Sequence, residues 1–303
     1  MVRQIIEIDQ MNNFNRPLFS IIMPSFNQAD YIEQAIESVL AQSYDKIELI
    51  VGDGGSSDHT VEILKRHSTE DHRLRWTSAP DFGPAHALNK CFRAARGQII
   101  GWLNSDDLYV PEAVAKAHKA LTENPHWILC YGQGEYVDES GGFLSRYPTQ
   151  RPSIGMSKFR DGCFICQPTV FFKTVMLTLI GDLNTSYLTA FDYEYWIRAF
   201  NAFPERIGFI DSVLAQSRLH EDCITNKMRE TVALEGLKLG RDYLGGAQVH
   251  WAVTYLEELQ KQTTGDFAAF QTQARSFIQK SEGFLSALDH QAIISALDQG
   301  LSR

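Results

Sequence analysis

The sequence predicts an α/β fold in which a mostly parallel β-sheet is flanked by helices. Between residues 18 and 110, short apolar runs rich in β-forming residues alternate four times with helical patterns. Such alternation is typical of strand–helix–strand crossovers, which build parallel sheets with helices on both faces. The apolar runs also lack polar alternation, as expected for parallel strands that are buried on both faces.

The first half of the chain supplies these units in order. We expect strands over residues 18–25, 47–51 and 74–78, and a fourth that begins at Ile99. The first helix covers residues 31–40, where Asp30 and Glu33 have the spacing of a capping box. A second helix contains Val61 and Leu64, and a third is opened by Pro84 and closed by Gly97.

The pattern changes after Trp127. Residues 128–137 and 142–147 predict a β-hairpin, residues 169–172 and 207–219 predict further strands, and residues 193–200 predict a helix. From residue 227 the pattern is helical. We therefore predict an N-terminal extension (residues 1–16), a main domain (17–226, with halves at 17–110 and 111–226) and a helical C-terminal region (227–303).

Composition excludes several classes of function. The chain has 28 Lys and Arg against 37 Asp and Glu, a net charge of −9, which argues against nucleic acid as a partner. Its start lacks the pattern of a secretory signal, and no uncharged apolar stretch approaches 18 residues, so we expect no transmembrane segment. The five scattered cysteines fit a reduced, cytoplasmic protein, and the CxxC of Cys163 and Cys166 has no second pair to complete a zinc site.

Two adjacent acids, Asp106 and Asp107, follow the fourth predicted strand. The carboxyl end of a strand is where open α/β sheets bind ligands. Two neighbouring carboxylates repel each other, and a divalent cation that also contacts a phosphate would relieve this repulsion. Alternatively, the pair caps a helix that starts near Pro111.

The other strand ends are Pro24-Ser25-Phe26-Asn27, Asp53-Gly54-Gly55 and Asp81-Phe82-Gly83, and they fall on the same edge of the predicted sheet. A dinucleotide-binding G-x-G-x-x-G is absent because Ser57 occupies the third glycine position, and no P-loop is present. An acidic edge of this kind favours recognition of a nucleotide through its base and ribose. Asp53 and Asp81 are alternatively turn residues.

These motifs, taken together, resemble the inverting family 2 glycosyltransferases, which have the GT-A fold. The resemblance covers residues 20 to 225 and includes six motifs in the family's order. They are Pro24–Asn27, Asp53–Asp58, Asp81–Lys90, Asn104–Asp107, Phe191–Arg198 and Ser217–His220. The implied fold is GT-A-like, with the C-terminal helices as an extension.

The resemblance implies a role for each matching residue. Asp192 corresponds to the catalytic base, and Asp107 to the direct ligand of a divalent cation, Mn²⁺ or Mg²⁺. His220 corresponds to a residue that reaches the metal or the diphosphate. The nucleotide-sugar site is implied to include the remaining residues: Pro24, Ser25, Phe26, Asn27, Asp53, Asp81, Gly83, Asn89, Asp106 and Arg218.

Simpler interpretations of several residues stay open. Asp192 is alternatively the N-cap of its own helix, His220 a surface histidine and Asn89 a solvated helix residue. Many members of the family place Glu-Asp where this chain has Phe191-Asp192, so the surroundings of the base differ here. Glu194 is the alternative base, although it lies about 200° further around the helix.

The implied activity is transfer of a sugar from a nucleotide-diphosphate donor to an acceptor hydroxyl, with inversion, in polysaccharide or glycoconjugate synthesis. UDP is favoured over GDP and dTDP, and the acceptor is a carbohydrate or is lipid-linked, which would bring the protein to the inner membrane surface. A non-catalytic sugar-nucleotide-binding protein and a nucleotidyltransferase are the alternatives. The C-terminal helices carry near-neutral charge, and we expect them to pack on the main domain or form a homodimer.

Overall fold

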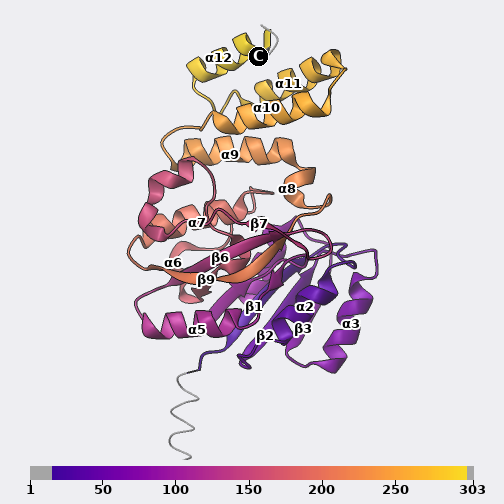
Figure 1. Ribbon diagram of the computed structural model, residues 1–303, viewed down its shortest axis with the longest axis vertical. Helices are drawn as coiled ribbons and strands as arrows, with labels where there is room; N and C mark the ends of the chain where they lie inside the picture. Colours follow the sequence, from indigo (N-terminus) through magenta and orange to yellow (C-terminus); the bar gives the residue numbers. More distant parts are fainter. Residues whose placement is uncertain (1–15, 299–303) are drawn as a thin grey trace, which may run out of the picture. The chain divides into compact units, whose positions relative to one another are not determined.

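A computed structural model describes residues 16–298 of the chain (Figure 1). These residues form two compact units. The first contains the chain up to Gly155, together with Phe164–Ser186 and Arg198–His220. The second contains Met156–Cys163, Tyr187–Ile197 and the chain from Glu221 onward. No helix within residues 16–298 combines the length and the apolarity needed to cross a membrane.

The first unit is built on one mixed sheet with the strand order β3-β2-β1-β4-β8-β6-β9-β5, to which β7 is added beside β6. Its first part is parallel, as predicted, and contains β1 (Phe19–Ser25), β2 (Ile47–Asp53), β3 (Leu74–Ser78) and β4 (Ile99–Trp102). Every residue of β2 and β4 is buried. This burial explains why their residues, apart from Glu48 and Asp53 of β2, are apolar or small without alternation.

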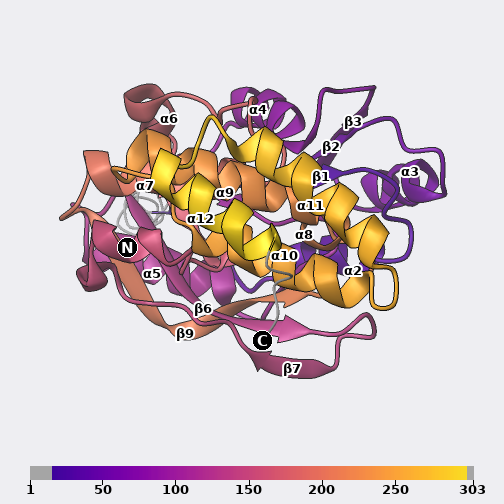
Figure 2. The same ribbon diagram turned by 90° about the horizontal axis from the view of Figure 1, so that it is seen from above.

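Helices cover both faces of the parallel part (Figure 2). They are α2 (Ile32–Leu40), α3 (Thr60–Glu70) and α4 (Pro84–Ala94). Helix α2 buries a stripe at helical spacing that packs with Leu49 and Val51 of β2. On the opposite face, a Cβ at Gly52 would lie 2.6 Å from Cys91 Sγ of α4, so only glycine permits this close approach.

The rest of the first unit surrounds the mixed part of the sheet. It contains β5 (Leu108–Tyr109), α5 (Ala113–Glu123), β6 (Leu129–Val137), β7 (Phe143–Arg146), β8 (Phe171–Lys173), α6 (Val175–Ile180) and β9 (Ile207–Arg218), with short 3₁₀ turns at Pro152–Ile154 and Gln167–Thr169. The predicted hairpin is confirmed, because β6 and β7 pair antiparallel. Strand β5 pairs antiparallel with β9, which aligns Leu108 with Gln216.

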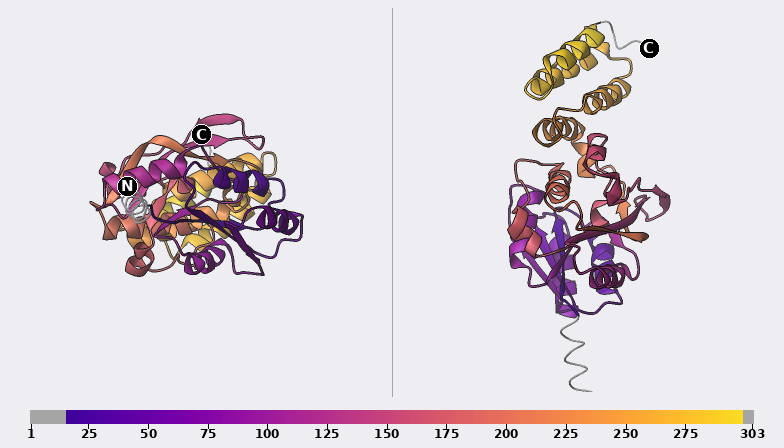
Figure 3. Two further views of the ribbon diagram at one scale, coloured as in Figure 1. Left: turned by 90° about the horizontal axis from the view of Figure 1, so that it is seen from below. Right: turned by 90° about the vertical axis from the view of Figure 1, so that its left-hand side faces the viewer.

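The second unit is helical (Figure 3), and its buried side chains form a core of their own. It contains the 3₁₀ turn Met156–Arg160, the beginning of α7 (Phe191–Ala202), and α8 (Ile224–Lys227), α9 (Arg229–Tyr243), α10 (His250–Gln262), α11 (Phe267–Ser281) and α12 (Ala287–Asp298). Leu237, Leu256 and Phe277 are buried in this core and come from three successive helices.

Two local predictions are wrong. The capping box is absent, since Tyr31 precedes α2 without a side-chain cap and Glu33 pairs with Arg66 instead. Gly97 does not close the third helix, which ends at Ala94. Gly97 lies beside β1, where a Cβ would meet the carbonyl oxygen of Leu18 at 2.5 Å, so this glycine serves strand packing.

Candidate functional site

The parallel register brings the strand ends together at one edge of the sheet. Ser25 at the end of β1 is paired with Asp53 at the end of β2, which in turn is paired with Ser78 at the end of β3. Pro24 lies one position earlier, opposite Gly52. This edge is therefore a row of short polar side chains, as the sequence predicts.

Asp53 organises the turn that follows β2. Its carboxylate accepts hydrogen bonds from the backbone N–H groups of Gly55 (3.1 Å) and Ser56 (3.0 Å) and from Ser78 Oγ (2.6 Å). Only 3% of Asp53 is exposed. The turn-residue interpretation therefore describes the geometry of Asp53. If Asp53 also contacts the base of a nucleotide, it must do so while keeping these hydrogen bonds.

Two buried polar atoms at this edge have no hydrogen-bond partner among the described residues. They are Ser25 Oγ and Gln28 Oε1. Buried polar atoms are almost always paired in native proteins, so an orphan atom calls for an explanation such as a missing ligand. Their position at the end of β1 matches the predicted nucleotide site.

The predicted Phe26, Asn27, Asp81 and Gly83 surround the Asp53–Asp58 turn. Phe26 is 59% exposed, and a Cβ at Gly54 would lie 3.2 Å from Phe26 Cδ2 and 3.0 Å from Asp81 Oδ2. Asn27 Oδ1 accepts from the Ser57 N–H (2.9 Å), and Asp81 Oδ1 accepts from the Gly83 N–H (2.8 Å). An exposed aromatic ring beside a carboxylate suits a planar base with N–H donors.

Both polar atoms of the Asn89 side chain are already hydrogen-bonded within the chain. Its Nδ2 donates to the carbonyl oxygen of Leu183 (2.9 Å) and its Oδ1 accepts from the Leu183 N–H (2.9 Å). Asn89 is 5% exposed, so it is not solvated either. Both of its polar atoms hold the chain at Leu183, which assigns Asn89 a structural role in place of the predicted donor contact.

The Asp106–Asp107 turn is held against the end of β9. The turn connects β4 to β5, and the pairing of β5 with β9 brings it next to Ser217–His220. Asp107 Oδ1 accepts from the Arg218 backbone N–H (3.0 Å), and Asp107 Oδ2 accepts from Asn104 Nδ2 (3.3 Å). Burial, and then repulsion from Asp106, hold the pKa of Asp107 well above its ordinary value.

Asp106 and His220 form a pair beside this buried acid. His220 Nε2 lies 3.1 Å from Asp106 Oδ2, and the Asp106 side chain retains 19% exposure. His220 is 5% exposed and its ring lies 4.6 Å from the Tyr31 ring, so it is not a surface histidine. Two ligands on adjacent corners of an octahedron with bonds of about 2.1 Å lie about 3 Å apart. The 3.1 Å separation is that of a hydrogen-bonded ion pair, and the same two atoms are close enough together that they could share a divalent cation. Asp106 Oδ2 is thus the carboxylate oxygen of this turn that lies next to His220.

Arg218 differs from the expectation. Its guanidinium donates to the carbonyl oxygens of Asp106 (2.9 Å) and Glu139 (2.6 Å) and to Gln34 Oε1 (2.9 Å), and only 2% of the residue is exposed. These contacts join three separate segments of the first unit. Arg218 therefore braces the Asp106 turn, and the expected contact with phosphates does not fit this burial.

Asp192 lies in the first turn of α7, in the second unit. The helix begins at Phe191, and Glu194 N–H bonds to the Ala190 carbonyl oxygen, so Asp192 is not the N-cap. Burial raises the pKa of Asp192 to about 6, and the charge of Glu235 adds to this rise. The alternative base, Glu194, is 1% exposed and accepts from Tyr243 Oη (2.6 Å).

Glu235 was not identified from the sequence, although its charge contributes to the raised pKa of Asp192. This residue belongs to α9 and is 8% exposed, and it is surrounded in the sequence by Ala233, Leu234, Gly236 and Leu237. A single acid within an apolar helical stretch is the signal that could have identified it, because buried carboxylates need partners.

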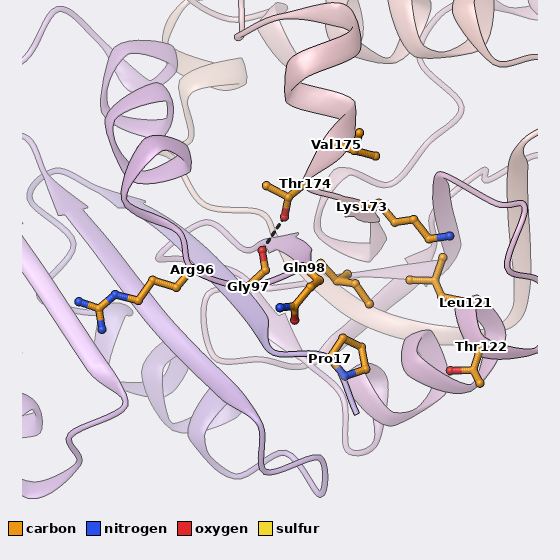
Figure 4. A pocket seen from close by; sticks show the side chains of 10 residues that line it. Pro17, Arg96, Gly97, Gln98, Leu121, Thr122, Lys173, Thr174 and Val175 are labelled. Carbon is orange, nitrogen blue, oxygen red and sulfur yellow. Dashed lines mark hydrogen bonds between the residues drawn. The ribbon is translucent and has the colours of Figure 1, made fainter. Parts of the chain in front are cut away.

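A pocket of about 500 Å³ lies away from the predicted site, at the amino ends of the parallel strands (Figure 4). Pro17, Arg96, Gly97 and Lys173 are among its lining residues, and Thr174 Oγ1 donates to the Gly97 carbonyl oxygen (2.6 Å). Pro17 and Gln98 precede β1 and β4, so this pocket lies at the amino ends of parallel strands. None of the predicted site residues lines it.

Comparison with known proteins gives the family. The model for "Glycosyl transferase family 2" matches residues 20–177. The chain belongs to glycosyl transferase family 2. An uncharacterized glycosyltransferase of Haemophilus influenzae is 36% identical over 233 residues, which cover 76% of this chain and 91% of that protein. The family-model match covers the Asp53 and Asp106 turns of this family 2 chain.

Other family 2 relatives are longer. An uncharacterized glycosyltransferase of Rickettsia felis is 31% identical over 72% of this chain but only 37% of its own length. Chondroitin synthase of Escherichia coli is 29% identical over 62% of this chain and 27% of its own length. The chain thus spans less than half the length of these two relatives.

Solved structures confirm the GT-A fold of this family 2 chain. Residues 1–349 of S. aureus TarS, in complex with UDP-GlcNAc, superpose with a TM-score of 0.61 at 16% identity, over 93% of this chain and 92% of that one. The mannosyltransferase PcManGT from Pyrobaculum calidifontis, in complex with GDP-Man and Mn²⁺, gives a TM-score of 0.57 at 18% identity, over 95% and 81%.

Proposed function

We propose that this chain is a metal-dependent inverting glycosyltransferase that uses a nucleotide-diphosphate sugar. The observation that carries the proposal is the Asp106–His220 pair at the carboxyl edge of the sheet, in the same unit as the orphan Ser25 Oγ and the exposed Phe26. A nucleotide-sugar donor is also supported by the ligands of the structural neighbours, UDP-GlcNAc for TarS and GDP-Man with Mn²⁺ for the mannosyltransferase. UDP remains the favoured nucleotide, with GDP and dTDP as the alternatives.

In this mechanism Asp106 and His220 would hold the divalent cation, Mn²⁺ or Mg²⁺, while Asp107 and Arg218 hold the turn in place. The cation, when bound, stabilises the negative charge that develops on the leaving diphosphate. Phe26, Asp53 and Asp81 contribute to the base and ribose site. Asp107 is the alternative metal ligand, and single substitutions of Asp106 and Asp107 distinguish which of the two carboxylates binds the cation.

Asp192 acts as the general base. Its carboxylate takes the proton of an acceptor hydroxyl while that oxygen forms a bond to the anomeric carbon. The bond between this carbon and the diphosphate oxygen breaks on the opposite side, and its electron pair leaves with the diphosphate. Attack from the opposite face inverts the configuration. A pKa of about 6 for Asp192 keeps the carboxylate ionised near neutral pH and basic enough to accept a proton.

The acceptor we propose is a carbohydrate or a lipid-linked sugar in polysaccharide or glycoconjugate synthesis. Homodimerisation through the C-terminal helices is part of the same proposal, supported by the exposure of Phe267 (61%) and Leu288 (80%) in the second unit.

A thermal-shift panel tests the donor site. UDP, GDP, dTDP and CMP are each added with Mn²⁺, with Mg²⁺ and with chelator. A ligand at a hundredfold excess over its dissociation constant stabilises the folded state by about 2.7 kcal/mol. We expect a metal-dependent shift with one nucleoside diphosphate, UDP first. No shift with any nucleotide would contradict the proposed donor site.

A further inference from the structure

Glu235 of α9 makes four hydrogen bonds to the segment that leads into α7. It accepts from the backbone N–H groups of Leu188 (2.6 Å), Thr189 (2.8 Å) and Ala190 (2.9 Å), and from Thr189 Oγ1 (2.7 Å). Three of these donors reach Oε2 and one reaches Oε1, so both carboxylate oxygens are engaged. All of these residues belong to the second unit. Glu235 therefore acts as a clamp between the C-terminal helices and this segment.

The clamp sets the start of α7. The carbonyl oxygen of Ala190 accepts the first helical bond from Glu194 N–H (2.9 Å), so Ala190 is the N-cap position and its own N–H has no partner within the helix. Glu235 accepts from this N–H group and from those of the two residues before it. A carboxylate at a helix N-terminus satisfies such groups and interacts favourably with the helix dipole. Asp192 lies in this first turn, two residues after Ala190, so a displacement of the segment that Glu235 holds would also move Asp192.

A second contact fixes the same two helices. Tyr243 Oη at the end of α9 donates to Glu194 Oε1 on α7 (2.6 Å), and Lys238 of α9 lies 4.2 Å from the centre of the Tyr187 ring. The pKa of Tyr187 is raised by burial and then by the charges of Asp242, Tyr243, Glu194 and Glu235. The pKa of Tyr193 is raised by burial and then by Cys163, Asp161 and Asp192. Glu235 is the residue whose charge raises the pKa of Asp192, after burial itself.

We propose that Glu235 is a positioning residue for the transfer reaction, and that the helical C-terminal region thereby takes part in catalysis by holding the base-bearing turn of α7. The inference rests on the proposed role of Asp192 as the base. Glu235 lies outside the residues that the family model matches, so the proposal assigns a function to a part of the chain that the family match leaves unexplained.

The test compares Glu235→Gln, Glu235→Ala and Glu230→Gln in the full-length chain. Glu230 is the matched control, because it lies on the same helix but pairs with Lys280 Nζ (2.9 Å). Three properties are measured for each: the pKa of Asp192 by carboxyl NMR titration, Mn²⁺-dependent UDP affinity, and the rate of nucleoside diphosphate release from the donor sugar as a function of pH.

We expect Glu235→Gln to lower the pKa of Asp192 and to move the acidic limb of the rate profile to lower pH, because a negative charge is removed. Glu235→Ala leaves the N–H groups before α7 without their acceptor, and we expect kcat to fall on the order of tenfold, since small misplacements of a catalytic group are costly. UDP affinity stays unchanged in both, and Glu230→Gln behaves as wild type.

Unchanged kcat and an unchanged acidic limb in both Glu235 variants would overturn the inference, and so would a parallel loss of UDP affinity, which indicates general destabilisation. If the variants shift the pKa of Asp192 but neither the wild type nor Asp192→Asn releases nucleotide, the proposed function has failed while the contact between Glu235 and α7 stands. The two failures are thus distinguishable.

Discussion

The Asp106–Asp107 turn and the first turn of α7, which carries Asp192, are held in place in different ways. Both carry an acid whose pKa is raised first by burial and then by a neighbouring carboxylate, Asp106 in one case and Glu235 in the other. Asp107 is held by Asn104 and by the backbone at Arg218, which β5 and β9 align by strand pairing. The Asp192 turn is held by a side chain of α9, which follows β9 in the chain.

The two acids differ in how far along the chain their charged neighbours lie. The neighbouring charge of Asp107 is the adjacent residue, so the sequence itself displays the pair. The neighbouring charge of Asp192 comes from a distant helix, and only the folded chain brings it there. We therefore expect metal and nucleotide binding to depend on the first unit, and the proton transfer to depend on the second.

The largest effect is expected from Asp192→Asn. General-base catalysis contributes about 10² to 10⁴ in rate, so turnover falls at least about a hundredfold. Nucleotide affinity stays close to that of the wild type, because the variant leaves the first unit unchanged. Nucleoside diphosphate release and UDP titration measure the two properties on the same samples. Glu194→Gln is the control, and a greater loss in that variant would transfer the role of base to Glu194.

Asp106→Asn and Asp107→Asn separate the two acids of the turn. If Asp106 binds the cation, its substitution weakens Mn²⁺-dependent UDP binding by at least about 10- to 100-fold, the range found for groups that support metal ligands. Asp107→Asn keeps an oxygen that accepts from Arg218 N–H, so we expect a smaller loss. Calorimetry with and without Mn²⁺ decides the assignment, and the reverse order of effects would return the ligand role to Asp107.

The pH profile tests the environment of Asp192. Its carboxyl must be ionised to accept a proton, so activity decreases as pH falls through about 6. One pH unit below the pKa, kcat/KM falls about tenfold. For stability the sign is opposite: the pKa of Asp192 in the folded chain lies above the ordinary value of 3.8, so its contribution to stability is present at low pH and is lost as pH rises through about 6. An acidic limb that stays near pH 4 would contradict the raised pKa.

The smallest effect on donor binding is expected from Asn89→Ala. Each of the two lost hydrogen bonds to Leu183 contributes about 1 kcal/mol, so the free energy of unfolding decreases by about 2 kcal/mol. Donor affinity stays the same, because both polar atoms of Asn89 serve the chain at Leu183. Denaturant unfolding and UDP titration measure the pair of effects. A loss of UDP affinity without destabilisation would restore the predicted donor contact.

The fold was predictable because its signals are local. Apolar runs mark buried strands, and Pro84 marks the start of α4 as expected. The common edge of Ser25, Asp53 and Asp106 also follows from parallel order alone. The capping box failed because Glu33 has a stronger partner, Arg66, on the neighbouring helix α3. Sequence spacing does not reveal such a competitor.

The position of a candidate site residue could be predicted from the sequence where the residue ends a strand of the parallel sheet. Its hydrogen-bond partners could not be predicted where they come from a distant part of the chain. Arg218 and Asn89 have the residue types of a donor site, but their hydrogen bonds go to distant segments: Asn89 bonds to both backbone groups of Leu183, and Arg218 donates to backbone carbonyl oxygens and to Gln34. Glu235 belongs to no recognised motif, and its carboxylate accepts hydrogen bonds from three backbone N–H groups in the segment that leads into α7. These pairings arise only when the chain folds.

The most direct test of the account is nucleotide release from intact donors. The full-length chain is incubated at high concentration with UDP-, GDP- and dTDP-sugars, each with Mn²⁺ or with chelator, beside Asp192→Asn. We predict Mn²⁺-dependent release of one nucleoside diphosphate, UDP first, by the wild type and at least about a hundredfold slower release by the variant. Tight Mn²⁺-dependent binding with no release above that of Asp192→Asn would contradict catalysis and identify a non-catalytic sugar-nucleotide-binding protein.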